Sequence, residues 1–295
     1  MDPVIRRCGR TRCDLPRTAR PCQVSPYILP AVPSTLLIPL AARAAGPQQF
    51  PWLDCHDAHA ANLLHCLDVN PERYVADAPT VINILWRTRE IKTIGAAFFQ
   101  RWPSALGVNL GCGLSSHFQW LDNGRNGWVD ADLPEVFALR EALLPPPTPR
   151  WCNTTVDLRE PDWWSALALP PRDADTPVLV LCEGVLMYLE PPQVHQVLRS
   201  FAEHAPAGSL FVLDTLSALA VGRASLHASV GRTGAEFHWG LRGPQELTGV
   251  HPRLRLQTLS SVTECYGWAA QATEACWQPW LGVPLYGLAT LGLAH

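Results

Sequence analysis

The 295-residue sequence has almost no lysine: Lys92 is the only one, and arginine supplies the other 22 of the 23 basic residues. Because 26 acidic residues oppose them, the formal net charge is −3. This balance excludes the strongly basic surface that nucleic-acid-binding proteins carry, so we expect no nucleic-acid partner. With 47% hydrophobic and 17% charged residues, the composition is that of a globular protein and excludes disorder as the main state.

Cysteine pairs at short spacing are also missing. None of the ten cysteines forms a C-x-x-C pair, and Cys182 ends an apolar run in which a free thiol behaves as a small buried hydrophobe. His56 and His59 could share one helical face, but the segment has no recognisable zinc spacing. We therefore expect no metal site and a reducing, cytoplasmic location.

The sequence has no long apolar run without helix-breaking residues. The longest uncharged run, residues 275–294, contains Pro279, Pro284 and three glycines, so it favours a buried terminal strand over a membrane span. Residues 1–30 are basic, and no apolar stretch of the kind found in a secretory signal follows the arginines. We interpret residues 1–30 as a disordered extension and residues 31–295 as a single domain, with no membrane partner.

What the chain does contain is a regular alternation of strands and helices. Apolar runs predict five strands at 106–110, 127–132, 151–156, 177–182 and 209–214, and two more at 254–262 and 284–293. Helical spacing predicts helices over 52–67, 82–99 and 191–204, with another opened by Pro134. This alternation predicts an α/β fold with a parallel sheet and right-handed crossovers.

Small or acidic residues follow four of these strands, where an open parallel sheet binds its ligands. They are Gly111 and Gly113, Asp130 and Asp132, Asp157 and Leu158, and Glu183 and Gly184. Singly, the glycines could form an ordinary turn and the carboxylates could cap helices. An acid after the second strand suits a nicotinamide or an adenosyl cofactor. Ser116 stands where a dinucleotide-binding loop requires Gly or Ala, which disfavours an NAD(P)-dependent oxidoreductase.

Three segments carry a resemblance to a known family. V-N-L-G-C-G-L at 108–114, D-A-D-L-P-E-V at 130–136 and E-G-V-L-M-Y-L at 183–189 resemble the leucine carboxyl methyltransferase family, and among its members the bacterial polyketide O-methyltransferases of the tetracenomycin type. Residues 35–40 and the pair Arg87-Thr88 resemble it as well. The resemblance implies a Rossmann-like class I methyltransferase fold: a mostly parallel seven-stranded sheet with helices on both faces and a helical lid, for which residues 216–250 are the candidate.

The resemblance also implies S-adenosylmethionine as the cofactor and a role for each matching residue. Arg87 would pair with the methionine carboxylate, Gly111 and Gly113 would line the cofactor, Asp132 would hold the ribose hydroxyls, Asp157 and Leu158 would flank the adenine, Glu183 would lie near the amino group or sulfonium, and Tyr188 would form a cation-π wall. Arg43 is the nearest candidate for a further basic contact of the family. A solvated helix face is the alternative for Arg87.

The implied reaction transfers a methyl group to a carboxylate or phenolic hydroxyl of a small molecule, as in secondary metabolism. A carboxylate is already ionised, whereas a phenol gains from a base. The candidate bases are His117, His195, His227 and His238. A protein that binds the cofactor without turnover is the remaining alternative.

We also expect the segment 216–250 to contribute to the acceptor site. Phe237 and Trp239 would supply its aromatic walls, and one of Arg223, Arg232 and Arg242 would face an anionic acceptor. A solvated loop with a few packed aromatic residues is the alternative. The identity of the acceptor and the oligomeric state do not follow from the sequence.

Overall fold

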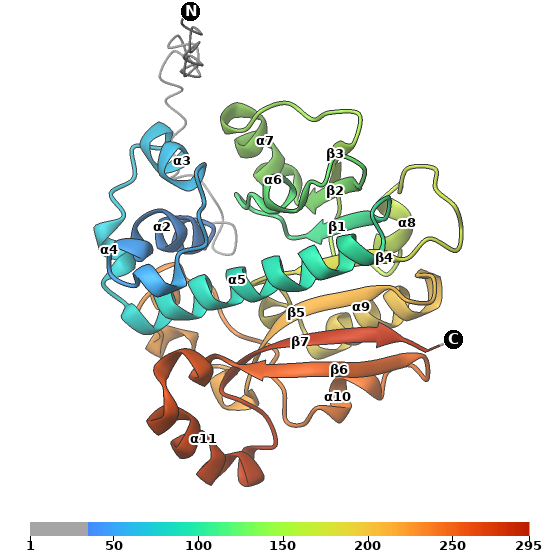
Figure 1. Cartoon of the computed structure of the whole chain (residues 1–295). Coiled ribbons are helices and arrows are strands. Elements are labelled where there is room, and N and C mark those ends of the chain that lie inside the picture. The colour runs from blue at the N-terminus through green and yellow to red at the C-terminus, as the bar shows by residue number, and fades with distance from the viewer. Residues whose placement is uncertain (1–34, 295) are drawn as a thin grey trace, which may run out of the picture.

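A computed structural model describes residues 35–294, and within them seven strands form one sheet in the order β3-β2-β1-β4-β5-β7-β6 (Figure 1). The strands are β1 (Leu106–Leu110), β2 (Gly127–Asp132), β3 (Trp151–Thr155), β4 (Val178–Cys182), β5 (Leu210–Leu216), β6 (Leu254–Ser261) and β7 (Tyr286–Leu293). The first five are parallel, and β7 runs antiparallel to both β5 and β6. The predicted α/β class and seven strands are confirmed.

Helices cover both faces of this sheet. They are α2 (Leu37–Ala45), α3 (Ala60–Cys66), α4 (Glu72–Val75), α5 (Ala78–Arg101), α6 (His117–Leu121), α7 (Pro134–Leu143), α8 (Trp163–Ala166), α9 (Pro191–His204), α10 (Gln245–Thr248) and α11 (Trp268–Leu281). The long helix α5 crosses one face, and α2, α3 and α4 gather on the side toward which β1 points (Figure 1). That side is the carboxyl end of the parallel strands.

The central strand β4 shows why the sheet needs two helical layers. All five residues of Val178–Cys182 are buried, and successive side chains point to opposite faces. Val180 packs in one core cluster with Phe201 of α9, and Leu181 packs in the other with Phe99 of α5. A continuous apolar strand of this kind is stable only when both faces are covered.

The predicted helix over 52–67 is wrong in its first half. The chain there forms a short 3₁₀ turn, Pro51–Leu53, followed by an irregular stretch, and α3 begins only at Ala60. Asp57 explains the late start, because its Oδ1 accepts hydrogen bonds from the backbone N–H groups of His59 and Ala60 at 3.0 and 3.1 Å. These bonds satisfy free donors at the start of the helix.

The candidate lid, residues 216–250, consists of short turns rather than long helices. It contains three 3₁₀ turns, η5 (Ala218–Ala220), η6 (Ala224–Leu226) and η7 (Val230–Arg232), before α10. A backbone bond from Trp239 N to Met187 O ties it to the loop after β4. The predicted extension, residues 1–30, lies outside the described residues.

The uncharged run 275–294 divides between α11 and β7, so the terminal strand is confirmed. Among the described residues, no helix combines the length and apolar character required to cross a bilayer.

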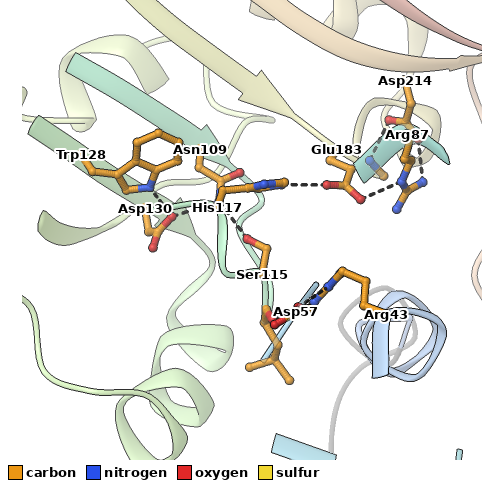
Figure 2. A network of polar contacts seen from close by, with 12 residues as sticks. Arg43, Asp57, Arg87, Asn109, Ser115, His117, Trp128, Asp130, Glu183 and Asp214 are labelled. Carbon is orange, nitrogen blue, oxygen red and sulfur yellow. Dashed lines mark hydrogen bonds and ion pairs between the residues drawn. The ribbon is translucent and has the colours of Figure 1, made fainter. Parts of the chain in front are cut away.

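A buried carboxylate joins β1, β2, β3 and α7. Asp130 accepts hydrogen bonds from the indole nitrogens of Trp128 and Trp151 at 2.9 and 2.8 Å, and from Asn109 at 3.0 Å (Figure 2). Its other partner is Arg140, whose Nη2 lies 2.5 Å away and which is also almost fully buried. Asp130 is thus fully used within the core, in contrast to Asp132, two residues further along the same strand.

We predict that Asp130→Asn lowers the free energy of unfolding by about 3 kcal/mol, because it leaves the buried Arg140 guanidinium without its counter-charge. The matched control is Asp122→Asn, which breaks a solvent-screened surface pair with Arg150 and should cost much less. Urea unfolding of the three proteins measures both changes. Equal stability of the two variants would contradict a structural role for Asp130.

Candidate active site

A deep cavity opens at the carboxyl ends of the parallel strands, with an empty volume of about 1130 Å³ including its mouth. Residues of the loops after β1, β2, β3 and β4 line this cavity, together with residues of α2. Of the eight predicted cofactor residues, seven line it: Gly111, Gly113, Asp132, Asp157, Leu158, Glu183 and Tyr188. The tertiary structure therefore brings together four strand ends that are far apart in the sequence.

The loop after β1 is held by Asp132. Gly111 and Gly113 adopt φ values of +62° and +50°, a left-handed conformation that side chains disfavour. Gly113 N–H donates to Asp132 Oδ2 at 2.7 Å, and Leu133 N–H donates to Oδ1 at 2.8 Å. Burial raises the pKa of Asp132, and these hydrogen bonds oppose that rise. The carboxylate thus fixes the glycine loop and still presents its oxygens to the cavity wall.

Asp157 and Leu158 lie side by side in the sequence but differ in environment. Leu158 is buried in the cavity wall. The Asp157 carboxylate bonds instead to Arg159, with 2.6 Å between Oδ2 and the Arg159 Nη2. This bond lowers the pKa of Asp157.

The Glu183 carboxylate is buried and bonds to two side chains from other elements (Figure 2). Its Oε1 accepts from Arg87 Nε at 2.7 Å, and its Oε2 lies 2.8 Å from His117 Nε2. Burial alone would raise the pKa of Glu183, but Arg87 and His117 outweigh it and hold that pKa well below its usual range. Because an ionised carboxylate can only accept hydrogen bonds, His117 Nε2 is the donor of this bond.

Arg87 links Glu183 to a second buried carboxylate. Its Nη1 donates to Asp214 Oδ2 at 2.8 Å and to the Tyr286 hydroxyl at 2.7 Å, and that hydroxyl donates to Asp214 at 2.8 Å. Arg87 lines a second cavity that adjoins the first. An added Cβ at Gly184, which lines both cavities, would lie 3.1 Å from Arg87 Nη2, so this nitrogen lies at their junction.

Arg43 lines the first cavity from α2 and is itself buried. Its Nε donates to Asp57 Oδ2 and its Nη2 donates to the Leu114 carbonyl, both at 2.9 Å. Asp57 also accepts from the Ser116 hydroxyl at 3.2 Å. Ser116 therefore has a structural role: its hydrogen bond to Asp57 connects the segment before α3 to the end of the glycine loop.

The four histidines proposed as bases fall into two groups. His195 and His238 are exposed, and neither lines the two cavities. His117 lines the first cavity and His227 the second. His227 Nδ1 accepts a hydrogen bond from Val230 N–H at 3.2 Å, so its lone pair is already used there.

None of the three lid arginines expected near the acceptor lines either cavity. Arg223, Arg232 and Arg242 are all exposed and lie outside the residues that line the two cavities. Of the two predicted aromatic walls, Phe237 lines the second cavity, whereas Trp239 packs into the core beside the sheet. The lid segment therefore presents apolar and aromatic side chains, and its charges point to solvent.

Comparison with known protein families identifies the family of this chain. Residues 39–202, more than half of the chain, match the family described as leucine carboxyl methyltransferase. The chain belongs to this family. It is a methyltransferase enzyme with S-adenosylmethionine as its cofactor, and the alternative of an NAD(P)-dependent oxidoreductase is wrong.

Relatives extend the match over most of the methyltransferase. The tetracenomycin polyketide synthesis O-methyltransferase of Streptomyces glaucescens is 29% identical over 90% of this chain and 95% of its own. An S-adenosylmethionine-dependent methyltransferase of Gibberella zeae is 27% identical over 80% of this chain and 86% of its own. A solved DUF574 family protein from Streptomyces avermitilis shares the fold, with a TM-score of 0.54, 18% identity, and coverage of 81% of this chain and 99% of its own.

The first cavity fits the cofactor chemically. Asp132 and Glu183 supply the carboxylate oxygens that ribose hydroxyls and an amino group require, and Leu133, Val136 and Leu158 supply an apolar wall for a base. His117 Nδ1 is buried without a hydrogen-bond partner among the described residues. In residues 35–294 no group of three or more metal-ligating side chains comes together.

Sequence reasoning missed the residues that act behind the cavity surface. Asp214 ends the predicted fifth strand, so the signal that found Glu183 could have found it. Asp57 and Tyr286 carry no such signal, because each comes from a segment outside the parallel strands and reaches the site only through folding.

We predict a pH-dependent difference in stability between the methyltransferase and Glu183→Gln. The native pKa of Glu183 lies below its unfolded value of 4.5, so the ionised carboxylate stabilises the fold fully above pH 4.5 and loses this contribution as the pH falls. The stability gap should narrow by about 1.4 kcal/mol for each pH unit below 4.5. Urea unfolding between pH 7 and pH 3.5 measures it, and a constant gap would contradict the ion pair.

Proposed function

We propose that this methyltransferase transfers a methyl group to an oxygen of a small molecule, either a carboxylate or a phenolic hydroxyl. The observation that carries the proposal is the single cavity in which Asp132 and Glu183 meet the glycine loop. The similarity to a polyketide synthesis O-methyltransferase supports oxygen as the acceptor atom and secondary metabolism as the setting.

In this proposal the predicted residues hold the cofactor as follows. Asp132 accepts from the ribose hydroxyls, Leu158 packs against the adenine, and Glu183 accepts from the amino group. Tyr188, which lines both cavities, forms the wall beside the sulfonium. Arg87 and Arg43 are the two cations near the cofactor carboxylate, and both already bond to protein carboxylates.

When bound, S-adenosylmethionine supplies a methyl group on a positively charged sulfur, which an oxygen nucleophile displaces in line. The contribution of the chain is to hold that oxygen in near-attack geometry and to exclude water. Gly184 and Tyr188, both half-buried, lie between the two cavities, and this position suits both tasks. A carboxylate acceptor needs no base, whereas a phenol must lose its proton.

We also propose a cytoplasmic location. The free thiols of Cys55, Cys112 and Cys182 are buried, which suits a reducing compartment.

We predict that Asp132→Asn weakens binding of S-adenosylhomocysteine by about 10- to 100-fold, because one oxygen that accepts hydrogen bonds becomes a donor. Calorimetric titration measures the affinity. Asp122→Asn, which removes a surface carboxylate outside the cavity, is the matched control and should bind like the wild type. Equal affinity of all three proteins would place the cofactor elsewhere.

The reaction itself is tested with methyl-labelled S-adenosylmethionine and three naphthalene acceptors that share one ring system. We expect label on 2-naphthoic acid or 2-naphthol and none on 2-naphthylamine. Alkali releases the methyl group from an ester but not from an aryl ether, so it identifies the oxygen that was methylated. Label on the amine alone, or on none of the three, would overturn the proposed O-methylation.

A further inference from the structure

The second cavity lies beyond Gly184 and Tyr188, with an empty volume of about 580 Å³. Thr35, Pro39, Gly184 and Tyr188 line both cavities, so the two spaces share a wall. Its other walls come from α2, the first turns of α5, the loop after β4, the end of β5, the lid segment and the first residue of β7. Of the eight predicted cofactor residues, two line this second cavity: Arg87 and Tyr188.

Aromatic rings form the lid side of this cavity. The rings of Tyr188 and Phe237 lie 5.7 Å apart with 36° between their planes, and the His227 ring meets Phe237 edge to face at 6.1 Å. Ile84 and Val230 add aliphatic surface on the other sides. Walls of this kind bind a flat apolar ring system by contact area and by stacking.

The cavity also has little charge to offer. Arg87 is the one charged residue among those described as lining it, and its Nε and Nη1 already bond to Glu183, Asp214 and Tyr286. Because two carboxylates surround one guanidinium, this cluster carries no spare positive charge. Recognition must therefore come from shape and apolar contact rather than from a salt bridge to the acceptor.

The aromatic wall is fixed to α5 rather than loose. Asp77 Oδ2, at the start of α5, accepts from the Ser229 hydroxyl at 2.8 Å and the Thr80 hydroxyl at 2.7 Å. The Thr80 hydroxyl lies 3.3 Å from His227 Nε2. Burial lowers the pKa of His227. Its Nδ1 accepts from Val230 N–H, and the Thr80 hydroxyl donates to Asp77, so Nε2 is the donor to the Thr80 oxygen. Both ring nitrogens are thus engaged, and His227 serves as a wall of the cavity.

We propose that this second cavity binds the methyl acceptor, and that the acceptor is a planar aromatic compound whose reacting oxygen lies beside Gly184 and Tyr188, where the cavities meet. The proposal rests on the O-methyltransferase function given above and adds the place and the class of its substrate. Phe237 and Tyr188 determine the preference for a flat ring.

The test compares two acids that differ in flatness, 2-naphthoic acid and decalin-2-carboxylic acid, by calorimetry on the full chain saturated with S-adenosylhomocysteine. We expect the aromatic acid to bind at least about five-fold more tightly. Equal affinity, tighter binding of the saturated acid, or no binding of either would overturn the proposal.

Asn83→Trp fills the cavity from α5, where Asn83 is half buried and outside the first cavity. The substitution should lower the affinity for 2-naphthoic acid by about ten-fold or more. Unchanged binding of S-adenosylhomocysteine would show that the fold is intact. Phe237→Leu keeps the bulk but removes the ring, and it should reduce only the preference for the aromatic acid. Leu226→Ala, an exposed change on the same lid, is the control.

The outcomes separate this proposal from the one on which it rests. If the aromatic acid binds and Asn83→Trp prevents it, the acceptor site stands even when no methyl group reaches an oxygen, and only the proposed O-methylation fails. If methyl transfer to an oxygen occurs but Asn83→Trp leaves aromatic binding unchanged, the acceptor lies elsewhere and only the present proposal fails.

Discussion

The ion pair between Arg87 and Glu183 is the interaction on which the site depends. Arg87 comes from the long helix α5, whereas Glu183 and Asp214 stand at the carboxyl ends of adjacent strands. Three buried charges at such a place are costly to desolvate, and they persist because each finds an oppositely charged partner at hydrogen-bond distance. The same contacts fix α5 against the sheet and set the orientation of the Glu183 carboxylate in the first cavity.

The two cavities at this end of the sheet differ in the polarity of their walls. The first presents carboxylates and the glycine loop, which suit the polar cofactor, and the second presents rings and aliphatic groups, which suit an apolar acceptor. Thr35, Pro39, Gly184 and Tyr188 line both cavities, and in the proposed arrangement the two substrates meet beside Gly184 and Tyr188. Positioning of this kind supplies much of the rate in a displacement reaction whose chemistry resides in the cofactor.

Asp130 and Asp132 lie two residues apart on β2, but one bonds within the core and the other bonds to the glycine loop at the cavity. Asp130 points to the core, where two indoles and Arg140 use all of its oxygens, and Asp132 points to the glycine loop and the cavity. The alternation of side chains along a strand would suggest the same face for residues two apart. The strand ends at Asp132, whose carboxylate accepts there from the backbone N–H groups of Gly113 and of Leu133, the residue before α7.

The sequence by itself determined the strands and the class of fold, because local apolar runs report these directly. Residues at strand ends, together with the family resemblance, also indicated seven residues that line the first cavity. The sequence did not determine that Arg87 would bond to Asp214 and Tyr286, that Asp57 would hold Arg43, or that Trp239 would pack into the core while Phe237 lines the second cavity. Those facts depend on which distant segments pack together. Only the tertiary structure decides that, because the partner of a side chain is chosen by the packing of whole helices and strands, which no local pattern encodes.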